Sequence, residues 1–332
     1  MKNLHKFLNV VALVIAVNSH AQVISEVKFK TIEKIYWSQI AKAPISSVLQ
    51  QNLQAKATLF LPNDLSKKYP AMVLVHGIGG LYNKAGEKRS YWGYAEFLAK
   101  NGVGVILVDT HGSRNHGTLS NTSQTSVPIF GFVADAYAAA DFLSTHPNID
   151  EKRIGVFGFS KGGTTVILSA DKRTTVLSKR GINFKTHVAI YPGCQTFMQE
   201  PQLTGNPLTL IIGKKDTYTG TSGCYEIQKN YAASTKLEVI ELDATHSWDE
   251  NIGSVKVDDL SSEKCRFYLQ NDGSEKNHNG QTLSTVPENK SQITPASNWE
   301  SCLAKRSDIY ITYNKLATDE AKRIVLTKAL SM

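Results

Sequence analysis

A single serine, Ser160, stands in a setting that would make its hydroxyl a nucleophile. It lies in the segment 158–163, Gly-Phe-Ser-Lys-Gly-Gly, which follows an apolar run typical of a buried strand and precedes a helix-like segment. A sharp strand–turn–helix connection holds the serine in a strained backbone conformation and therefore requires glycines beside it. The motif alone is a weak signal, because it also occurs by chance. Its position directly after a strand favours a nucleophile elbow over a structural turn.

A serine of this kind needs a base that accepts its proton, and His246 is the best-placed histidine. It stands in the loop that follows an apolar run at 237–242. A loop that leaves the carboxyl end of a late strand places an imidazole over the edge of a parallel sheet, within reach of the elbow. The alternative is a loop histidine that only hydrogen-bonds to Asp243 or Asp249. We favour the role of base.

Asp216 is the expected partner of this imidazole, because a histidine base needs an acid that fixes its tautomer and stabilises its cation. It follows the apolar run at 208–213, again at the carboxyl end of a strand. The chain order Ser160, Asp216, His246 is the order expected behind a nucleophile elbow of this kind. Asp243 competes for the role, but it lies within the turn just before the histidine.

A glycine-rich segment is suited to stabilise the negative oxygen that forms when a serine attacks a carbonyl group. Residues 76–80, His-Gly-Ile-Gly-Gly, follow a strand-like run, at the place where such folds supply a second amide. We assign the two donors of an oxyanion hole to the amides of Lys161 and Ile78, with Gly77 as the weaker candidate. His76 is expected to brace this loop without transferring protons.

These groups can meet only if parallel strands present their carboxyl ends at one edge of a sheet. Nearly continuous apolar runs, as expected for strands buried on both faces, lie at 57–61, 71–76, 103–109, 153–158, 187–191, 208–213 and 237–242. Helix-like patterns separate several of them, at 91–101, 132–145 and 164–170. This alternation predicts an α/β fold with a mostly parallel sheet and helices on both faces. Residues 27–30 and the run ending at Leu61 are expected to form an antiparallel edge.

The stretch 251–298 differs from the rest of the chain. It is rich in Asn, Ser, Gly and Lys and has no sustained helical or strand period. We predict a single domain over 22–332, with a polar insertion or small lid at 251–315 and a C-terminal helix at 316–330. The alternative for the polar stretch is a partly disordered loop.

The N-terminal residues predict export. Lys2 and Lys6 precede an apolar run at 7–17, and small residues up to Ala21 match a signal-peptidase site. We therefore predict a signal peptide at 1–21 and a periplasmic or secreted protein. The apolar run is short for a membrane-spanning helix, so a retained anchor is the less favoured alternative. We expect no membrane span after cleavage.

Composition and charge narrow the classes of partner. With 41% hydrophobic and 20% charged residues, the chain can bury a full core. The formal net charge is +8, and removal of the two signal-peptide lysines leaves +6 (8 − 2). No run of five or more Lys and Arg occurs, so we expect a solvated basic surface and no nucleic-acid binding. No Cys or His spacing resembles a zinc site, and we expect no metal and no cofactor.

Taken together, these residues resemble the dienelactone hydrolase family of the α/β-hydrolases, from about residue 57 to residue 246. The segment 109–114, Asp-Thr-His-Gly-Ser-Arg, is similar to a pocket-lining loop of this family, and 191–194 resembles a segment beside its site. Residues 313–330 are similar to the tails of exported relatives. The resemblance implies an α/β-hydrolase fold and hydrolysis of a carboxylic ester or lactone through an acyl-enzyme. It also suggests substrate contacts from His76, Gly77, Asp109, His111, Arg114, Tyr191 and Trp248.

Two departures from the family limit the substrate prediction. The founding enzyme uses a cysteine nucleophile and acts in the cytoplasm on a cyclic enol-lactone, whereas this chain has Ser160 and an export signal. We therefore expect a small-molecule ester other than dienelactone, and an acetylated carbohydrate also fits. An exopeptidase or amidase with the same residues is one alternative, and an inactive ligand-binding relative is another. The oligomeric state is not predicted.

Four cysteines in an exported protein suggest two disulfides, for which three pairings exist. The resemblance supports Cys194 with Cys224, because both follow strands that should be neighbours in the sheet. This bond would pin the loop that carries Asp216. The bond Cys265–Cys302 would then fasten the polar insertion. The alternative for Cys194 and Cys224 is two buried free thiols.

An arginine and two tryptophans near the expected site could serve either the fold or the substrate. Arg114 could bind a substrate carboxylate through its two-pronged guanidinium. It could equally pair with Asp109 or another acid to hold its own loop, which is the role we favour. Trp92 and Trp248 could line the entrance, but aromatic residues near a sheet end more often pack in the core.

Overall fold

The computed structural model describes residues 22–41, 51–116, 127–257, 259–283 and 302–332. The predicted signal peptide, 1–21, and residues 284–301 of the predicted insertion lie outside the described residues. Within the described ranges, no helix has the length and apolar character needed to cross a membrane.

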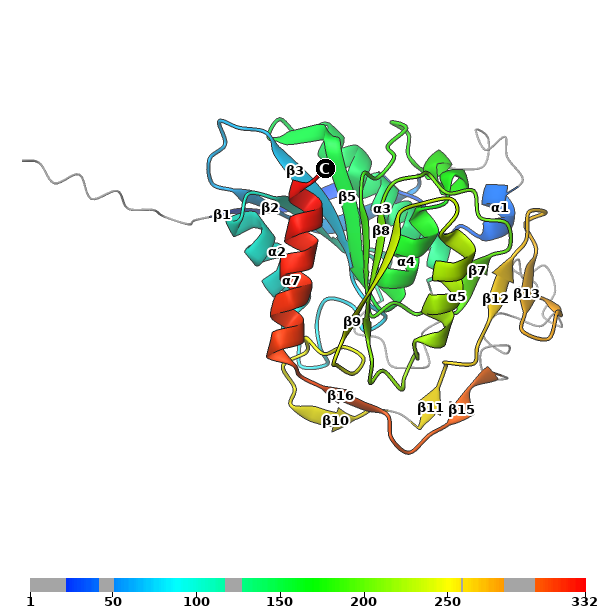
Figure 1. Cartoon of the computed structure of the whole chain (residues 1–332). Coiled ribbons are helices and arrows are strands. Elements are labelled where there is room, and N and C mark those ends of the chain that lie inside the picture. The colour runs from blue at the N-terminus through cyan, green and yellow to red at the C-terminus, as the bar shows by residue number, and fades with distance from the viewer. Residues whose placement is uncertain (1–21, 42–50, 117–126, 258, 284–301) are drawn as a thin grey trace, which may run out of the picture.

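A mostly parallel sheet forms the centre of the molecule (Figure 1), with the strand order β1-β2-β4-β3-β5-β6-β8-β9. Its strands are β1 (Gln22–Thr31), β2 (Leu53–Pro62), β3 (Tyr69–Val75), β4 (Gly104–Asp109), β5 (Ile149–Phe159), β6 (His187–Ile190), β8 (Leu208–Gly213) and β9 (Leu237–Leu242). The pairs β1–β2 and β2–β4 are antiparallel, whereas every pair from β4 to β9 is parallel. Each of the predicted strand runs coincides with one of these strands, including the antiparallel edge.

Alternate residues of the strands enter two separate cores, one on each face of the sheet. In β3, Ala71, Val73 and Val75 face one core, while Met72 and Leu74 face the other. Burial on both faces explains why these strands are almost continuously apolar. The first core is covered by α3 (Ile129–Ser144), α4 (Lys161–Ser169) and α5 (Ser222–Tyr231), the second by α2 (Tyr91–Lys100) and α7 (Lys315–Leu330). Figure 1 shows α7, in red, across the face opposite α3 and α4.

Several short elements complete the described part of the chain. The helical ones are α1 (Trp37–Ala41) and the 3-10 helices η2 (Gly112–Arg114) and η4 (Lys172–Leu177). The helix α5 has no counterpart among the predicted helices, because its sequence begins Ser-Gly-Cys and carries few apolar residues. The disulfide Cys194–Cys224 ties its first turn to the segment after β6. The second disulfide is Cys265–Cys302, so both bonds have the expected pairing.

The described part of the polar insertion consists of short strands. These strands, with β7 from the preceding region, are β7 (Thr196–Met198), β10 (Ser254–Lys256), β11 (Leu260–Ser261), β12 (Phe267–Leu269), β13 (Glu275–Asn277), β14 (Thr282–Leu283), β15 (Ala304–Lys305) and β16 (Tyr310–Thr312). They form a sheet in the order β14-β13-β12-β7 and the two-stranded ribbons β10–β16 and β11–β15. Figure 1 shows both ribbons at the lower end of the main sheet, where the chain continues from the carboxyl end of β9. Strands of two or three residues are too short to give a periodic sequence signal.

Candidate active site

The expected nucleophile occupies a strained turn between β5 and α4. Ser160 has φ 52° and ψ −113°, a conformation that non-glycine residues rarely adopt. The turn closes tightly against β3. A Cβ atom on Gly162 would lie 2.2 Å from the carbonyl oxygen of Val75, and one on Gly158 would lie 2.5 Å from the carbonyl oxygen of Gly162. The glycines therefore allow the close approach that presents Ser160 at the carboxyl edge of the sheet.

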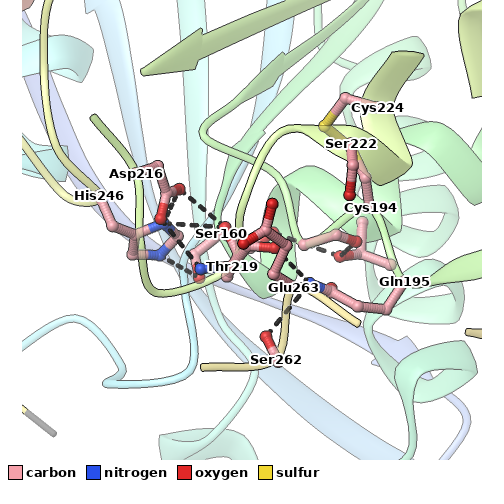
Figure 2. The surroundings of a disulfide bond; sticks show 12 residues. Ser160, Cys194, Gln195, Asp216, Thr219, Ser222, Cys224, His246, Ser262 and Glu263 are labelled. Carbon is pink, nitrogen blue, oxygen red and sulfur yellow. Dashed lines mark hydrogen bonds and ion pairs between the residues drawn. A yellow bond between two sulfur atoms is a disulfide. The ribbon is translucent and has the colours of Figure 1, made fainter. Parts of the chain in front are cut away.

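A continuous hydrogen-bonded chain joins the three residues singled out from the sequence. The distance from Ser160 Oγ to His246 Nε2 is 3.0 Å, and that from His246 Nδ1 to Asp216 Oδ2 is 2.7 Å. They come from the ends of three strands, β5, β8 and β9. Figure 2 shows the imidazole lying between the serine and the carboxylate. The arrangement can transfer a proton from the hydroxyl to the imidazole while the carboxylate holds the ring.

The carboxylate of Asp216 is held by its own turn. Its Oδ1 accepts hydrogen bonds of 2.9 Å from the amides of Tyr218 and Thr219, and its Oδ2 accepts one of 2.7 Å from the Thr219 hydroxyl. Burial alone would raise the pKa of Asp216, but the charge of His246 and these hydrogen bonds outweigh it, so the pKa is lowered. Asp243 is exposed and pairs instead with Lys215 at 2.8 Å.

Aromatic rings enclose the imidazole of His246, which is 2% exposed. The ring centre of Tyr191 lies 4.9 Å away and that of Tyr218 lies 5.3 Å away, both edge-on. The hydroxyl of Tyr191 donates to Asp249 Oδ1 at 2.7 Å, and Trp248 packs on the Tyr191 ring at 4.7 Å with no exposed surface. Tyr191 thus packs directly against the histidine, and Trp248 packs against Tyr191 in the protein interior.

The glycine-rich loop after β3 lies against the nucleophile. A Cβ atom on Gly77 would be 3.4 Å from Ser160 Cβ, and the Gly77 amide donates a hydrogen bond of 3.2 Å to the hydroxyl of Tyr91. Tyr91 is buried at the start of α2, with its ring 4.9 Å from that of Phe159. The Gly77 amide is therefore committed to Tyr91, which favours Ile78 as the oxyanion donor of this loop.

Two buried histidines contact the backbone of the same loop. His76 is fully buried, and its Nδ1 lies 2.6 Å from the Gly77 carbonyl oxygen. His111 is 2% exposed, and its Nε2 lies 3.0 Å from the carbonyl oxygen of Ile78. Burial lowers the pKa of His76 and lowers that of His111 to about 2, so both rings are neutral. Each contacts the loop backbone, and neither ring is positioned to exchange protons with solvent.

The side chain of Lys161 contacts two residues that lie before the nucleophile in the sequence. Its Nζ donates to the carbonyl oxygen of Val127 at 2.9 Å and lies 4.8 Å from the ring centre of Phe132. Burial lowers the pKa of Lys161 to about 8. The amide of Lys161 lies at the N-terminus of α4, directly after the nucleophile turn, which is where an oxyanion donor is expected.

The pocket-lining loop suggested by the resemblance is held together by Arg114 and Asp109. The guanidinium of Arg114 forms a two-pronged contact with Asp135, at 2.7 and 3.1 Å, and also donates to the carbonyl oxygens of Ile32, Glu33 and Thr110. Its side chain is only 5% exposed. Asp109 accepts the Gly112 amide at 2.8 Å. Arg114 therefore has the structural role, with Asp135 as its acid, and is not available to a substrate.

Three residues around the site were not given a supporting role from the sequence. Thr219 binds the carboxylate of Asp216, and Tyr91 binds the glycine-rich loop. Asp249 accepts the hydrogen bond of Tyr191, whose ring contacts the imidazole of His246. Only Thr219 had a local signal, because an Asp followed by amides two and three residues on forms a common side-chain turn. In the described ranges, no group of three His, Cys, Asp or Glu side chains is placed to hold a metal ion.

Comparison with solved structures agrees with the observed fold. A dienelactone hydrolase-like promiscuous phosphotriesterase from metagenomic libraries is 15% identical and has a TM-score of 0.54, with 93% of this chain and 98% of that chain covered. At this identity the likeness shows the α/β-hydrolase fold alone. The thiohydrolase aneE of Aspergillus aculeatus is 34% identical over 110 residues, 32% of each protein. The chain thus spans about a third of the length of the curated relatives it matches.

The strongest comparison is with a protein family. It covers the nucleophile turn, the aspartate, the histidine and the glycine-rich loop. Residues 55–265, well over half of the chain, match the dienelactone hydrolase family, and the chain belongs to that family.

Proposed function

We propose that this protein hydrolyses ester bonds through an acyl-enzyme formed on Ser160. The observation that carries the proposal is the hydrogen-bonded chain from Ser160 through His246 to Asp216, with distances of 3.0 and 2.7 Å. Membership of the dienelactone hydrolase family supports the same reaction class. The strained elbow supports it further, because backbone strain of this kind is retained where it serves a site.

The proposed reaction has two halves. His246 accepts the proton of Ser160 as Oγ attacks the ester carbonyl carbon, and Asp216 stabilises the resulting imidazolium. The negative oxygen accepts hydrogen bonds from the amides of Lys161 and Ile78. His246 then donates its proton to the leaving alcohol. In the second half it takes a proton from water, whose oxygen attacks the acyl carbon. The bond to Ser160 Oγ then breaks, His246 returns the proton to Oγ, and the acid is released.

The substrate is proposed to be a small or medium carboxylic ester or lactone. A relative that matches part of the chain is named a thiohydrolase, so thioesters belong in the same substrate panel. Amides test whether the site also cleaves the stronger bond. We further propose that the protein is periplasmic or secreted, because disulfides such as Cys194–Cys224 and Cys265–Cys302 persist in oxidising compartments.

A fluorophosphonate probe tests the proposal directly, because it labels only an activated serine. Wild type, Ser160→Ala and His246→Ala are incubated with the probe and their intact masses are measured. The matched control is Ser254→Ala, which removes an exposed hydroxyl that hydrogen-bonds to the hydroxyl of Thr312. Circular dichroism establishes that each variant is folded.

The proposed function predicts one adduct on wild type and on Ser254→Ala, and none on the other two variants. Hydrolysis of 4-nitrophenyl acetate should follow the same pattern. Folded wild type that neither reacts with the probe nor cleaves any ester or thioester would refute the proposal and favour a ligand-binding protein.

A further inference from the structure

The turn that carries Asp216 is bound from outside by two segments distant in sequence. One is the segment after β6 that contains Gln195, and the other is the strand β11 with Ser262 directly after it. Figure 2 shows Gln195 reaching between Thr219 and Ser262, beside the chain formed by Ser160, His246 and Asp216. The contacts of this glutamine point to a function in catalysis beyond that of the three reacting residues.

Thr219 determines where the carboxylate of Asp216 can lie. Its amide donates to Oδ1 at 2.9 Å and its hydroxyl donates to Oδ2 at 2.7 Å, so both carboxylate oxygens are tied to one residue. The same hydroxyl lies 3.3 Å from His246 Nδ1. A displacement of Thr219 would therefore move the carboxylate relative to the imidazole.

Gln195 fixes Thr219 through its backbone. The Nε2 of Gln195 donates to the Thr219 carbonyl oxygen at 3.0 Å and to Ser262 Oγ at 3.1 Å. Gln195 and Ser262 are each 4% exposed. Water cannot readily replace a hydrogen bond between buried groups. Loss of the Gln195 amide would therefore leave the buried carbonyl group of Thr219 without this donor.

The insertion binds the neighbouring carbonyl group of the same turn. The carbonyl oxygen of Tyr218 accepts hydrogen bonds from the Ser262 amide at 2.9 Å and from Ser261 Oγ at 3.2 Å. The insertion is attached to Gln195 in return, because the Phe267 amide donates to the Gln195 carbonyl oxygen at 2.8 Å. The turn is thus held between the β6 segment and the insertion, with Gln195 bonded to both.

We propose that Gln195 is a positioning residue for the catalytic acid, and that the C-terminal insertion acts on catalysis through Gln195 and Ser262. This inference rests on the proposed function. Gln195 touches neither the nucleophile nor the imidazole. It acts by holding Thr219, and through Thr219 the carboxylate that stabilises the imidazolium in the transition state. An interaction of this kind changes kcat and leaves KM unchanged.

The test uses Gln195→Met, which keeps the length of the side chain and removes its donor. Gln270→Met is the matched control, because its Nε2 donates to Gln199 and to the Tyr268 carbonyl, away from the acid turn. Hydrolysis of 4-nitrophenyl acetate gives kcat and KM, and thermal unfolding reports stability. Both substitutions are made in the wild-type protein and in Asp216→Asn.

In the wild-type protein, Gln195→Met should lower kcat by about 10- to 100-fold with KM unchanged, since small misplacements of catalytic groups have effects of this size. Gln270→Met should leave kcat unchanged. In Asp216→Asn the effect of Gln195→Met should fall to about twofold or less, because residues that act through one another are not additive. An unchanged kcat in folded Gln195→Met, or an equal loss in both backgrounds, overturns the inference.

A second variant covers the case in which Gln195→Met does not fold. Ser262→Ala removes one partner of Gln195 and should lower kcat several-fold, again only when Asp216 is present. An unaffected kcat in Ser262→Ala then overturns the inference. Folded wild type without any esterase activity overturns the proposed function and this inference together. Active wild type with an unaffected Gln195 variant overturns this inference alone.

Discussion

The hydroxyl of Tyr191, whose ring packs edge-on against the imidazole of His246, donates a hydrogen bond of 2.7 Å to the buried carboxyl group of Asp249. Burial raises the pKa of Asp249 to about 7, although the hydrogen bond from Tyr191 acts in the opposite direction. The adjacent Glu250 raises it further. Asp249 is therefore protonated in the folded protein at pH values where an exposed aspartate is ionised.

This shift predicts a pH dependence of stability. An unfolded aspartate titrates near 3.8, whereas folded Asp249 keeps its proton up to about pH 7. Between these values the folded state binds the extra proton, so the free energy of unfolding falls as the pH rises. The fall is at most about 1.4 kcal/mol for each pH unit. Asp249→Asn cannot titrate and should lose this contribution, as measured by urea unfolding from pH 5 to pH 8.

The difference between wild type and variant is the informative quantity. Buried His76 and His111 have lowered pKa values and give a slope of the opposite sign, but they do so equally in both proteins. Asp243→Asn serves as the control, because Asp243 is exposed. If Asp249→Asn and wild type show the same slope, Asp249 does not titrate in this range.

The assignment of the acid predicts a large contrast between two aspartates. Asp216→Asn keeps the shape of the side chain but favours the wrong tautomer of His246, and should lower kcat by about 10⁴-fold. Asp243→Asn removes only an exposed pair with Lys215 and should change kcat by less than about twofold. Steady-state hydrolysis of 4-nitrophenyl acetate measures both. A comparable loss in the two variants would contradict the assignment of Asp216.

The sequence predicted the strands and singled out the three residues of the hydrogen-bonded chain because their signals are local. Apolar runs mark strands buried on both faces, and Ser160, Asp216 and His246 each directly follow a strand or lie in the loop after one. A residue at that place reaches the carboxyl edge of a parallel sheet whatever the rest of the chain does. The position of the nucleophile turn was therefore readable without knowledge of tertiary contacts.

The partners of these residues could not be read in the same way. Arg114 pairs with Asp135 and not with Asp109, although Asp109 is closer in sequence. Gln195 reaches Ser262 across more than sixty residues and has no motif around it. Such contacts depend on how β6, β8 and the insertion meet in space. Short strands like β11 could not be predicted either, since two residues cannot show a period.

The buried ion pair of Arg114 predicts a loss of stability and not of substrate affinity. Arg114→Ala would leave Asp135, 1% exposed, without its partner, which typically costs about 3–5 kcal/mol. The KM for esters should stay unchanged in the fraction that folds. Urea unfolding and steady-state kinetics measure the two quantities, with Arg323→Ala as an exposed control that pairs with Glu320. A raised KM at unchanged stability would instead identify Arg114 as a substrate ligand.

We expect substitution by alanine to have opposite effects on stability at two glycines, one in the nucleophile turn and one in α2. In Gly162→Ala the new Cβ would stand 2.2 Å from the carbonyl oxygen of Val75, a backbone atom that cannot move without disturbing β3. In Gly93→Ala the new Cβ would lie 3.6 Å from Nζ of Lys322, the far end of a flexible side chain.

Thermal unfolding should therefore show a large decrease in the midpoint for Gly162→Ala, together with loss of probe labelling at Ser160. For Gly93→Ala, in the first turn of α2, the midpoint should rise slightly, because alanine has a higher helix propensity than glycine, by at most about 1 kcal/mol. Equal midpoints for the two variants would mean that the turn can relax away from β3. Ser160 would then be held by its neighbours in α4, and the close approach of Gly162 would not be the cause of its strained conformation.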